Sequence, residues 1–261
     1  DEYAHGASAY ALASKLSGQP AYNEAGELYM RACDAPYMTD ETGPSGAFVY
    51  ADWLRQLGQG NNSPQLTEAV SVRSAGSAAY LYLPSALGML LGRALGLSFY
   101  GVWLLGRLGS LAAYLALGTW ALRRMPFGKT LLFTALVLPS TLGLAAGLSA
   151  DTLIIGCSFA LTALCLDCAF GRRQVRGGDL CGLVGPGKAV YILLVGLVFL
   201  IPAECYSSPR RCVLARCLTV GAAGLGWAFY NLEYIRYILR DVNEWAVWGG
   251  LVLLAVLAAL L

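Results

Sequence analysis

The sequence predicts an all-α, polytopic membrane protein with one large polar segment at its N-terminus. Hydrophobic residues make up 57% of the 261 positions and charged residues only 13%, whereas soluble domains carry roughly 25% charged residues. The charges are clustered, and the apolar blocks between them lack the polar face of a soluble amphipathic helix. Such blocks are typical of helices surrounded by lipid, so a soluble globular fold is excluded.

Residues 1–78 differ from the rest of the chain in polarity and charge. They hold nine acidic and four basic residues, a net charge of −5, whereas the whole chain has a net charge of +2. We expect them to form an extracytoplasmic loop domain with two short surface helices, near Glu2–Leu16 and Ser45–Leu57. The basic residues elsewhere lie at the ends of apolar blocks and not in a stripe with interleaved aromatics, which argues against a nucleic-acid partner.

The remainder divides into a short apolar segment and a transmembrane domain. Residues 79–96 are too short to span and are broken by Pro84, which predicts an interfacial or re-entrant helix. Residues 97–261 are expected to form a transmembrane helical domain of about six spans, judged against the ~20 residues that a bilayer requires. These spans are predicted at about 99–122, 130–150, 152–170, 189–203, 213–230 and 245–261. We also expect a further span before residue 1 and further residues after the last one.

Clusters of Lys and Arg set the expected orientation, because short cytoplasmic loops are enriched in them. One such loop contains Arg123, Arg124 and Lys129. Another contains Arg172, Arg173 and Arg176. The tip of the hairpin between them, residues 149–151, then faces the outside, together with the acidic segment 1–78. A third cluster near Arg210 conflicts with this pattern unless residues 178–204 form a tight hairpin or residues are missing there.

Ionisable groups near the membrane are the first candidates for chemistry, because a charge in hydrocarbon costs ~2.5–3.5 kcal/mol or more. Arg107 lies within a predicted span, about a third of the way in, and is a candidate anion site. The alternative is an arginine that reaches the interface or pairs with an acid. Asp151 begins a predicted helix at the outer face. It is either an N-terminal capping residue or an acidic group of a site formed with the outer loop.

Asp1, Glu2 and His5 form the densest cluster of proton-transfer groups in the sequence, and His5 is its one histidine. A carboxylate held near an acceptor hydroxyl can act as a general base. A carboxylate and a histidine can also hold a divalent metal. The alternative is that these residues belong to an ordinary solvated loop. By contrast, the Cys165 and Cys168 pair lies in an apolar run, where cysteines are typically small hydrophobic residues.

Four short motifs occur in a recognisable order. An Asp-Glu pair opens the outer loop, a Tyr-x-Pro helix follows, a span bearing Arg-Leu comes next, and a Ser-x-Asp stands at an outer helix start. They are DEYAH (1–5), YLPSALG (82–88), GRLGS (106–110) and LSAD (148–151). Over roughly residues 1–200 this order resembles a family of bacterial polytopic membrane proteins of unknown function. That family is itself similar to the GT-C superfamily of polyprenyl-phosphate-sugar glycosyltransferases, with relatives among protein O-mannosyltransferases and lipid A aminoarabinose transferases.

The resemblance implies a GT-C-like helical bundle with a particular site. In that superfamily an acid of the first outer loop is the general base on the acceptor, and the donor is a lipid-linked sugar phosphate. Asp1 would then be the base, with Glu2 or His5 orienting the acceptor or a divalent metal such as Mg or Mn. Arg107, or a metal held with Asp151, would neutralise the departing phosphate. The metal candidates are Asp1, His5 and Asp151.

These expectations combine into one functional hypothesis. The chain would lie in the bacterial plasma membrane and transfer a sugar from a polyprenyl-phosphate donor to a cell-envelope glycan or protein acceptor at the outer face. The alternative is a non-catalytic transporter, channel or assembly subunit that handles lipid-linked glycans. A transporter is expected to show inverted repeats and broken helices with ion-binding groups, and the sequence contains no convincing internal repeat.

Overall fold

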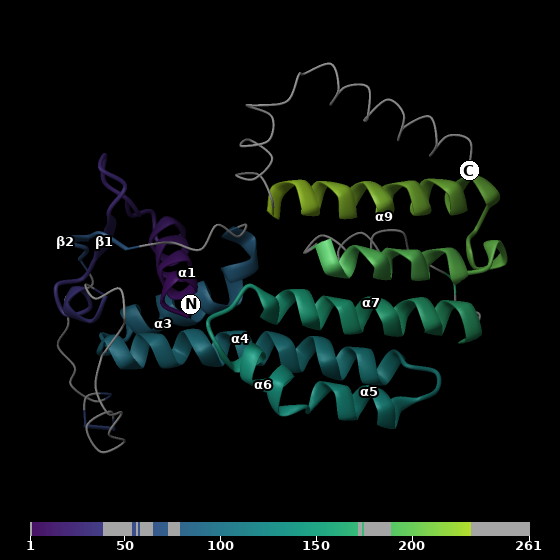
Figure 1. Ribbon diagram of the computed structural model, residues 1–261, viewed down its shortest axis with the longest axis horizontal. Coiled ribbons are helices and arrows are strands. Elements are labelled where there is room, and N and C mark those ends of the chain that lie inside the picture. The colour runs from purple at the N-terminus through teal and green to yellow at the C-terminus, as the bar shows by residue number, and fades with distance from the viewer. Residues whose placement is uncertain are drawn as a thin grey trace.

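The computed structural model describes residues 2–38, 54–55, 57, 65–72, 79–171, 174 and 189–230 and is mostly helical (Figure 1). Its elements, in chain order, are α1 (Glu2–Leu16), β1 (Leu28–Met30), η1 (Ala35–Tyr37), β2 (Glu68–Val70), η2 (Ala79–Tyr82), α3 (Leu83–Ala94), α4 (Phe99–Arg124), α5 (Lys129–Leu136), α6 (Pro139–Ala146), α7 (Asp151–Gly171), η3 (Ala189–Leu200), η4 (Ala203–Cys205) and α9 (Pro209–Tyr230).

An N-terminal lobe is built from α1, the two short strands and η1. Strands β1 and β2 pair antiparallel, with Leu28 opposite Val70. Helix α1 has the bounds predicted for it, and its buried face, which includes Ala9, Tyr10 and Ala13, belongs to the same hydrophobic core as the strands and the start of α4. The second helix predicted in this region, near Ser45–Leu57, lies almost wholly outside the described residues.

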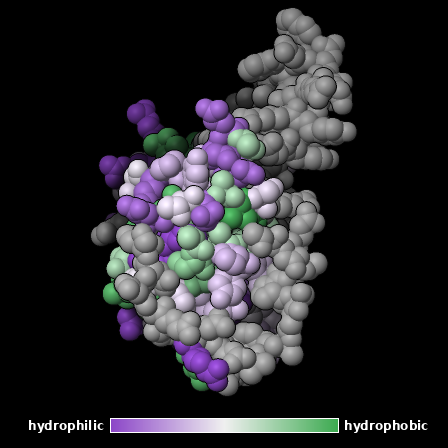
Figure 2. Space-filling model, turned by 90° about the vertical axis from the view of Figure 1, so that its left-hand side faces the viewer, coloured by the Kyte–Doolittle hydropathy of each residue, from purple (hydrophilic) through white to green (hydrophobic). Residues whose placement is uncertain are grey.

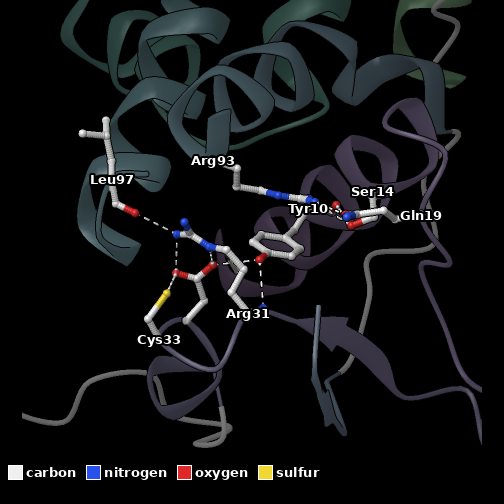
Figure 3. A network of polar contacts seen from close by, with 8 residues as sticks. Tyr10, Ser14, Gln19, Arg31, Cys33, Arg93 and Leu97 are labelled. Carbon is white, nitrogen blue, oxygen red and sulfur yellow. Dashed lines mark hydrogen bonds and ion pairs between the residues drawn. The ribbon is translucent and has the colours of Figure 1, made fainter. Parts of the chain in front are cut away.

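A buried polar network joins the lobe to the turn between α3 and α4 (Figure 3). The Arg31 guanidinium donates to Asp34 from Nε at 2.7 Å and from Nη2 at 2.8 Å, and both side chains are fully buried. The Tyr10 hydroxyl donates to the same Asp34 carboxylate at 2.7 Å. Arg31 Nη2 also donates to the Leu97 carbonyl at 2.9 Å. The Arg31–Asp34 pair thus joins α1, η1 and the turn that precedes α4.

A second buried arginine extends this network along α1. Arg93, in the last turn of α3, is 4% exposed and donates to Ser14 Oγ at 3.0 Å and to Gln19 Oε1 at 2.6 Å. Its guanidinium also lies 5.0 Å from the centre of the Tyr10 ring, a favourable cation–π geometry. The C-terminal half of α1 and the turn after it are therefore fastened to α3 by buried and partly buried side chains.

Helices α3 and α4 form a tight antiparallel hairpin because glycines let their backbones approach closely. A Cβ atom on Gly88 would collide with the Leu105 carbonyl, and one on Gly109 would collide with the Pro84 carbonyl. A Cβ on Gly92 would lie 2.9 Å from the Val102 Cα atom. Figure 1 shows α3 alongside the first half of α4, so the segment predicted at 79–96 forms η2 and a short helix that runs antiparallel to the long one.

Two helices are long and apolar enough to cross a membrane within the described ranges, and a bent pair provides a third candidate. They are α4, with 26 residues, and α7, with 21 residues, matching the spans predicted at 99–122 and 152–170. The span predicted at 130–150 is instead broken into α5 and α6, which meet at an angle of 56°. Pro139 begins α6, and a proline inside a helix removes one backbone hydrogen bond and clashes with the preceding turn.

The later predicted spans are only partly represented. Residues 189–203 contain η3, of 12 residues, and residues 213–230 fall within α9. With 12 residues, η3 is too short for a membrane span, whereas the 22 residues of α9 are enough for one, and the span at 213–230 stays a prediction. The stretch predicted at 245–261 lies outside the described residues. The described residues therefore support a membrane protein with two or three candidate spans, and a complete GT-C-like bundle stays a prediction.

The surface of the lobe differs from that of the long helices. Seen from the end that carries the lobe, the described surface mixes hydrophilic residues with a few hydrophobic patches (Figure 2). On the long helix α4, large apolar side chains face outward instead, such as Leu108 at 47% and Leu115 at 51% exposed. This contrast fits a lobe in an aqueous or headgroup environment and helices in lipid.

Candidate functional site

The candidate site is centred on an ion pair between the first turn of α1 and α4. Arg107 donates from Nε to Glu2 Oε1 at 2.7 Å and from Nη2 to Glu2 Oε2 at 2.6 Å. The Leu148 backbone N–H donates to Glu2 Oε1 at 3.2 Å. This two-bond geometry is the strong form of an arginine–carboxylate contact. The side chains are 45% exposed for Arg107 and 35% exposed for Glu2, so a ligand can reach the pair.

Close packing on either side fixes the position of this pair. A Cβ atom on Gly6, one turn after Glu2, would collide with the ring of Trp103, so only glycine lets α1 approach α4 here. A Cβ atom on Gly106 would lie 3.0 Å from the Leu148 side chain. Arg107 is therefore close to the loop that precedes α7. As the ninth of the 26 residues of α4, it lies about a third of the way along that helix, as the sequence predicted.

The charge state of Glu2 follows from its surroundings. Burial alone would raise the pKa of this carboxyl, but hydrogen bonds and the positive charge of Arg107 outweigh it and leave the pKa below its ordinary value. Glu2 is therefore ionised at neutral pH and holds protons weakly. A carboxylate of this kind is suited to orienting a cation or a hydroxyl and less suited to accepting a proton in catalysis.

His5 lies one turn along α1 from Glu2 and contacts a second motif of the sequence. Its Nδ1 atom is 2.6 Å from the Tyr82 hydroxyl, and the Tyr82 side chain is fully buried. Which atom carries the proton depends on the tautomer of the imidazole. The Tyr-x-Pro motif at 82–84 is thus the place where η2 meets α1, an arrangement that the sequence motif alone did not reveal.

The structure describes Asp151, whereas Asp1 lies outside the described residues. Asp151 is the first residue of α7, and its backbone N–H donates to Ser149 Oγ at 3.1 Å. It follows the Leu148 amide that contacts Glu2 by three residues, so it belongs to the same loop and helix start. Asp1 lies outside the described residues, and its assignment as general base stays a prediction.

The described part of the chain does not assemble a divalent-metal centre. No group of three or more His, Cys, Asp or Glu side chains suitable for a metal occurs among these residues. Glu2 is already engaged by Arg107, and His5 by Tyr82. The metal site predicted from Asp1, His5 and Asp151 depends on a residue outside the described ranges, so we derive no chemical step from a metal.

The comparisons with known proteins identify the family and nothing narrower. Residues 50–261 match the model of a family described as a predicted membrane protein (DUF2142). The chain belongs to the DUF2142 family. No curated protein and no solved structure matches the chain. Within the site, the DUF2142 match includes Tyr82, Arg107 and Asp151, whereas Glu2 and His5 precede it.

Proposed function

We propose that this DUF2142 protein binds a lipid-linked sugar phosphate at the outer membrane face and transfers the sugar to an envelope acceptor. The observation that carries the proposal is the Glu2–Arg107 pair, which two segments 105 residues apart bring together. The pair is partly exposed and lies where α7 begins. A guanidinium at that depth can meet a phosphate whose lipid chain stays in the bilayer.

The donor and the acceptor would approach from opposite directions. Below Arg107, α4 continues into the membrane with exposed apolar side chains, of which Leu108 is 47% and Leu115 51% exposed. A polyprenyl chain can lie along such a surface while its phosphate replaces the Glu2 carboxylate on Arg107. The acceptor hydroxyl would arrive from the aqueous side, where α1 and the lobe lie.

The proposed transfer is a single displacement at the anomeric carbon. The acceptor oxygen forms a bond to that carbon while its proton passes to a carboxylate, for which Asp1 is the candidate. The bond from the anomeric carbon to the phosphate oxygen breaks, and its electron pair leaves with the polyprenyl phosphate. Arg107 would stabilise this developing charge, and direct displacement inverts the anomeric configuration.

The test separates phosphate binding from transfer. Full-length protein in phospholipid vesicles would be titrated with farnesyl phosphate, with farnesol as the uncharged control. Arg107→Gln is expected to abolish the preference for the phosphate, and Glu2→Gln to increase affinity because it removes the competing carboxylate. Transfer of radiolabelled sugar from a polyprenyl-phosphate donor should fall at least a hundredfold in Arg107→Gln, as for other lost charge-stabilising donors. Equal binding of the two prenyl compounds would refute the proposal.

One observation favours a second candidate, a non-catalytic transporter of lipid-linked glycans. The 56° break between α5 and α6 resembles the discontinuous helices of transporters. The stretch 130–146 contains no Asp, Glu, Lys, Arg or His, however, and so offers no group for binding a coupling ion. Movement of a fluorescent prenyl-phosphate sugar across vesicles without sugar transfer would favour this candidate over the transferase.

A further inference from the structure

Helix α3 carries a row of exposed leucines that no described part of the chain covers. Leu83 is 43% exposed, Leu87 52%, Leu91 54% and Leu95 62%. Their spacing of four residues places them on one side of the helix. The opposite side of α3, including Ala86 and Met89, is buried in the lobe core. We refer to Leu83, Leu87, Leu91 and Leu95 as the leucine stripe.

The direction of α3 excludes the usual explanation for such a stripe. An amphipathic helix on a membrane lies in the plane of the interface. Here the glycine contacts pair Gly88 with Leu105 and Gly109 with Pro84, so α3 runs antiparallel to α4 and stands upright with it. A helix standing in this way can present its leucines to lipid only if part of it lies at the depth of the acyl chains.

The length of α4 indicates how deep α3 lies in the bilayer. Its 26 residues correspond to about 39 Å, whereas the hydrocarbon of a bilayer is about 30 Å thick. Counted outward from Arg123 at the cytoplasmic end, about 20 residues of α4 fill the hydrocarbon. The outer boundary then falls near Leu104. Since Pro84 packs on Gly109, Leu83 and Leu87 lie inside this boundary, and Leu91 lies close to it.

The contacts of η2 support this placement. The segment η2, which leads into α3, packs against α7 as well as against α1. Leu108 of α4, next to the Gly109 that packs on Pro84, is also 47% exposed, so both helices present apolar side chains outward.

We propose that the leucine stripe is a lipid-contact surface, with η2 and α3 forming a half-membrane limb embedded upright in the outer leaflet. The acyl chains of that leaflet contact Leu83 and Leu87, and the headgroup region surrounds Leu91 and Leu95. The Glu2–Arg107 pair, three residues along α4 from Leu104, consequently lies close to the outer hydrocarbon boundary and not in bulk water. This placement does not depend on any transferase activity.

Photocrosslinking tests the proposal without removing the native cysteines. p-Benzoylphenylalanine would replace Leu87 in the full-length protein, reconstituted in phosphatidylethanolamine and phosphatidylglycerol vesicles. Two leucines of similar exposure serve as references: Leu115 of α4, 51% exposed, for lipid, and Leu16 at the end of α1, 46% exposed, for water. After illumination, mass spectrometry measures the fraction of protein that carries a lipid adduct.

We expect the lipid-adduct yield at position 87 to lie within about threefold of the yield at position 115. It should also exceed the yield at position 16 by at least about tenfold, because benzophenone forms a lipid adduct by reacting with acyl C–H bonds, which only a hydrocarbon environment supplies. A yield at 87 equal to that at 16 would overturn the proposal. Protein–protein adducts in place of lipid adducts at 87 would overturn it too, because a second copy would then cover the stripe.

Discussion

The Asp34 carboxylate offers the sharpest test of how the lobe is held together. It accepts two hydrogen bonds from Arg31 and one from the Tyr10 hydroxyl, at 2.7–2.8 Å, and both charged side chains are fully buried. Asp34→Asn would keep the shape but leave the Arg31 charge buried without a counterion. Breaking a buried pair in this way costs about 3–5 kcal/mol. We expect the lobe to lose about that much stability against local opening.

Hydrogen exchange of lobe amides in nanodiscs can measure this loss. The Tyr29 N–H donates to the Ala21 carbonyl at 2.9 Å and exchanges when the lobe opens. Since 1.4 kcal/mol corresponds to a factor of ten, Asp34→Asn should speed exchange at Tyr29 by roughly a hundredfold to a few thousandfold. Amides in the middle of α7 should be unaffected, because opening of the lobe leaves the membrane helices in place.

Two further variants make the interpretation specific. Glu27→Gln alters an acid whose side chain accepts from Asn23 Nδ2, at 2.7 Å, in a partly exposed turn, and should change the free energy of opening by less than about 1 kcal/mol. Arg31→Met combined with Asp34→Leu removes both charges and should restore most of the protection, as replacements of buried pairs often do. Exchange at Tyr29 that stays within twofold of wild type in Asp34→Asn would refute the reasoning.

Three other predictions concern the membrane helices and α1. Gly109→Ala should lower the free energy of unfolding by about 1–3 kcal/mol, measured by thermal unfolding, because the new methyl group meets the Pro84 carbonyl. The control Gly143→Ala should not destabilise the protein, because open space surrounds that position. Tyr114→Phe should cost about 0.5–2 kcal/mol in steric-trap unfolding, since the Tyr114 hydroxyl donates at 2.8 Å to the last carbonyl of α5 at the helix break. Folding lowers the pKa of Glu2. The stability that Glu2 adds to the docking of α1 should therefore be fully present at pH values above the ordinary pKa of a carboxyl group, and it should be lost as the pH falls through the pKa of Glu2 in the folded protein. Hydrogen exchange in α1 between pH 3 and pH 6 should show this, and Glu2→Gln should remove the dependence.

The sequence predicted the membrane helices better than the lobe, for a physical reason. A span is recorded locally, as an uninterrupted apolar run of sufficient length, and the runs at α4 and α7 were recognised nearly to their ends. The broken span also had a local signal, Pro139, whose effect on a helix is known. Buried charges have no such signal. Arg31 and Asp34 counted only toward the net charge of a polar segment, yet both are fully buried.

The candidate site was predictable as a set of residue types and not as a set of contacts. Pairing with an acid was one of the two interpretations open for Arg107, but Glu2 lies 105 positions away and nothing local selects it. The same holds for His5 and Tyr82, which are 77 positions apart. Glycine positions were the one indirect signal, because Gly6 and Gly106 are required by close helix contacts on either side of the ion pair.

The network in the lobe and the ion pair at the membrane belong to one mechanical unit, because α1 connects them. Tyr10 and Ser14 fasten the C-terminal part of α1 to Arg31 and Arg93, while Glu2 occupies its first turn. Glu2 and Tyr10 are eight residues apart, about 12 Å along a rigid helix. A partly exposed ion pair contributes little stability by itself, so the buried side chains supply most of the docking of α1. Arg107 can therefore exchange the Glu2 carboxylate for another anion without loss of the fold.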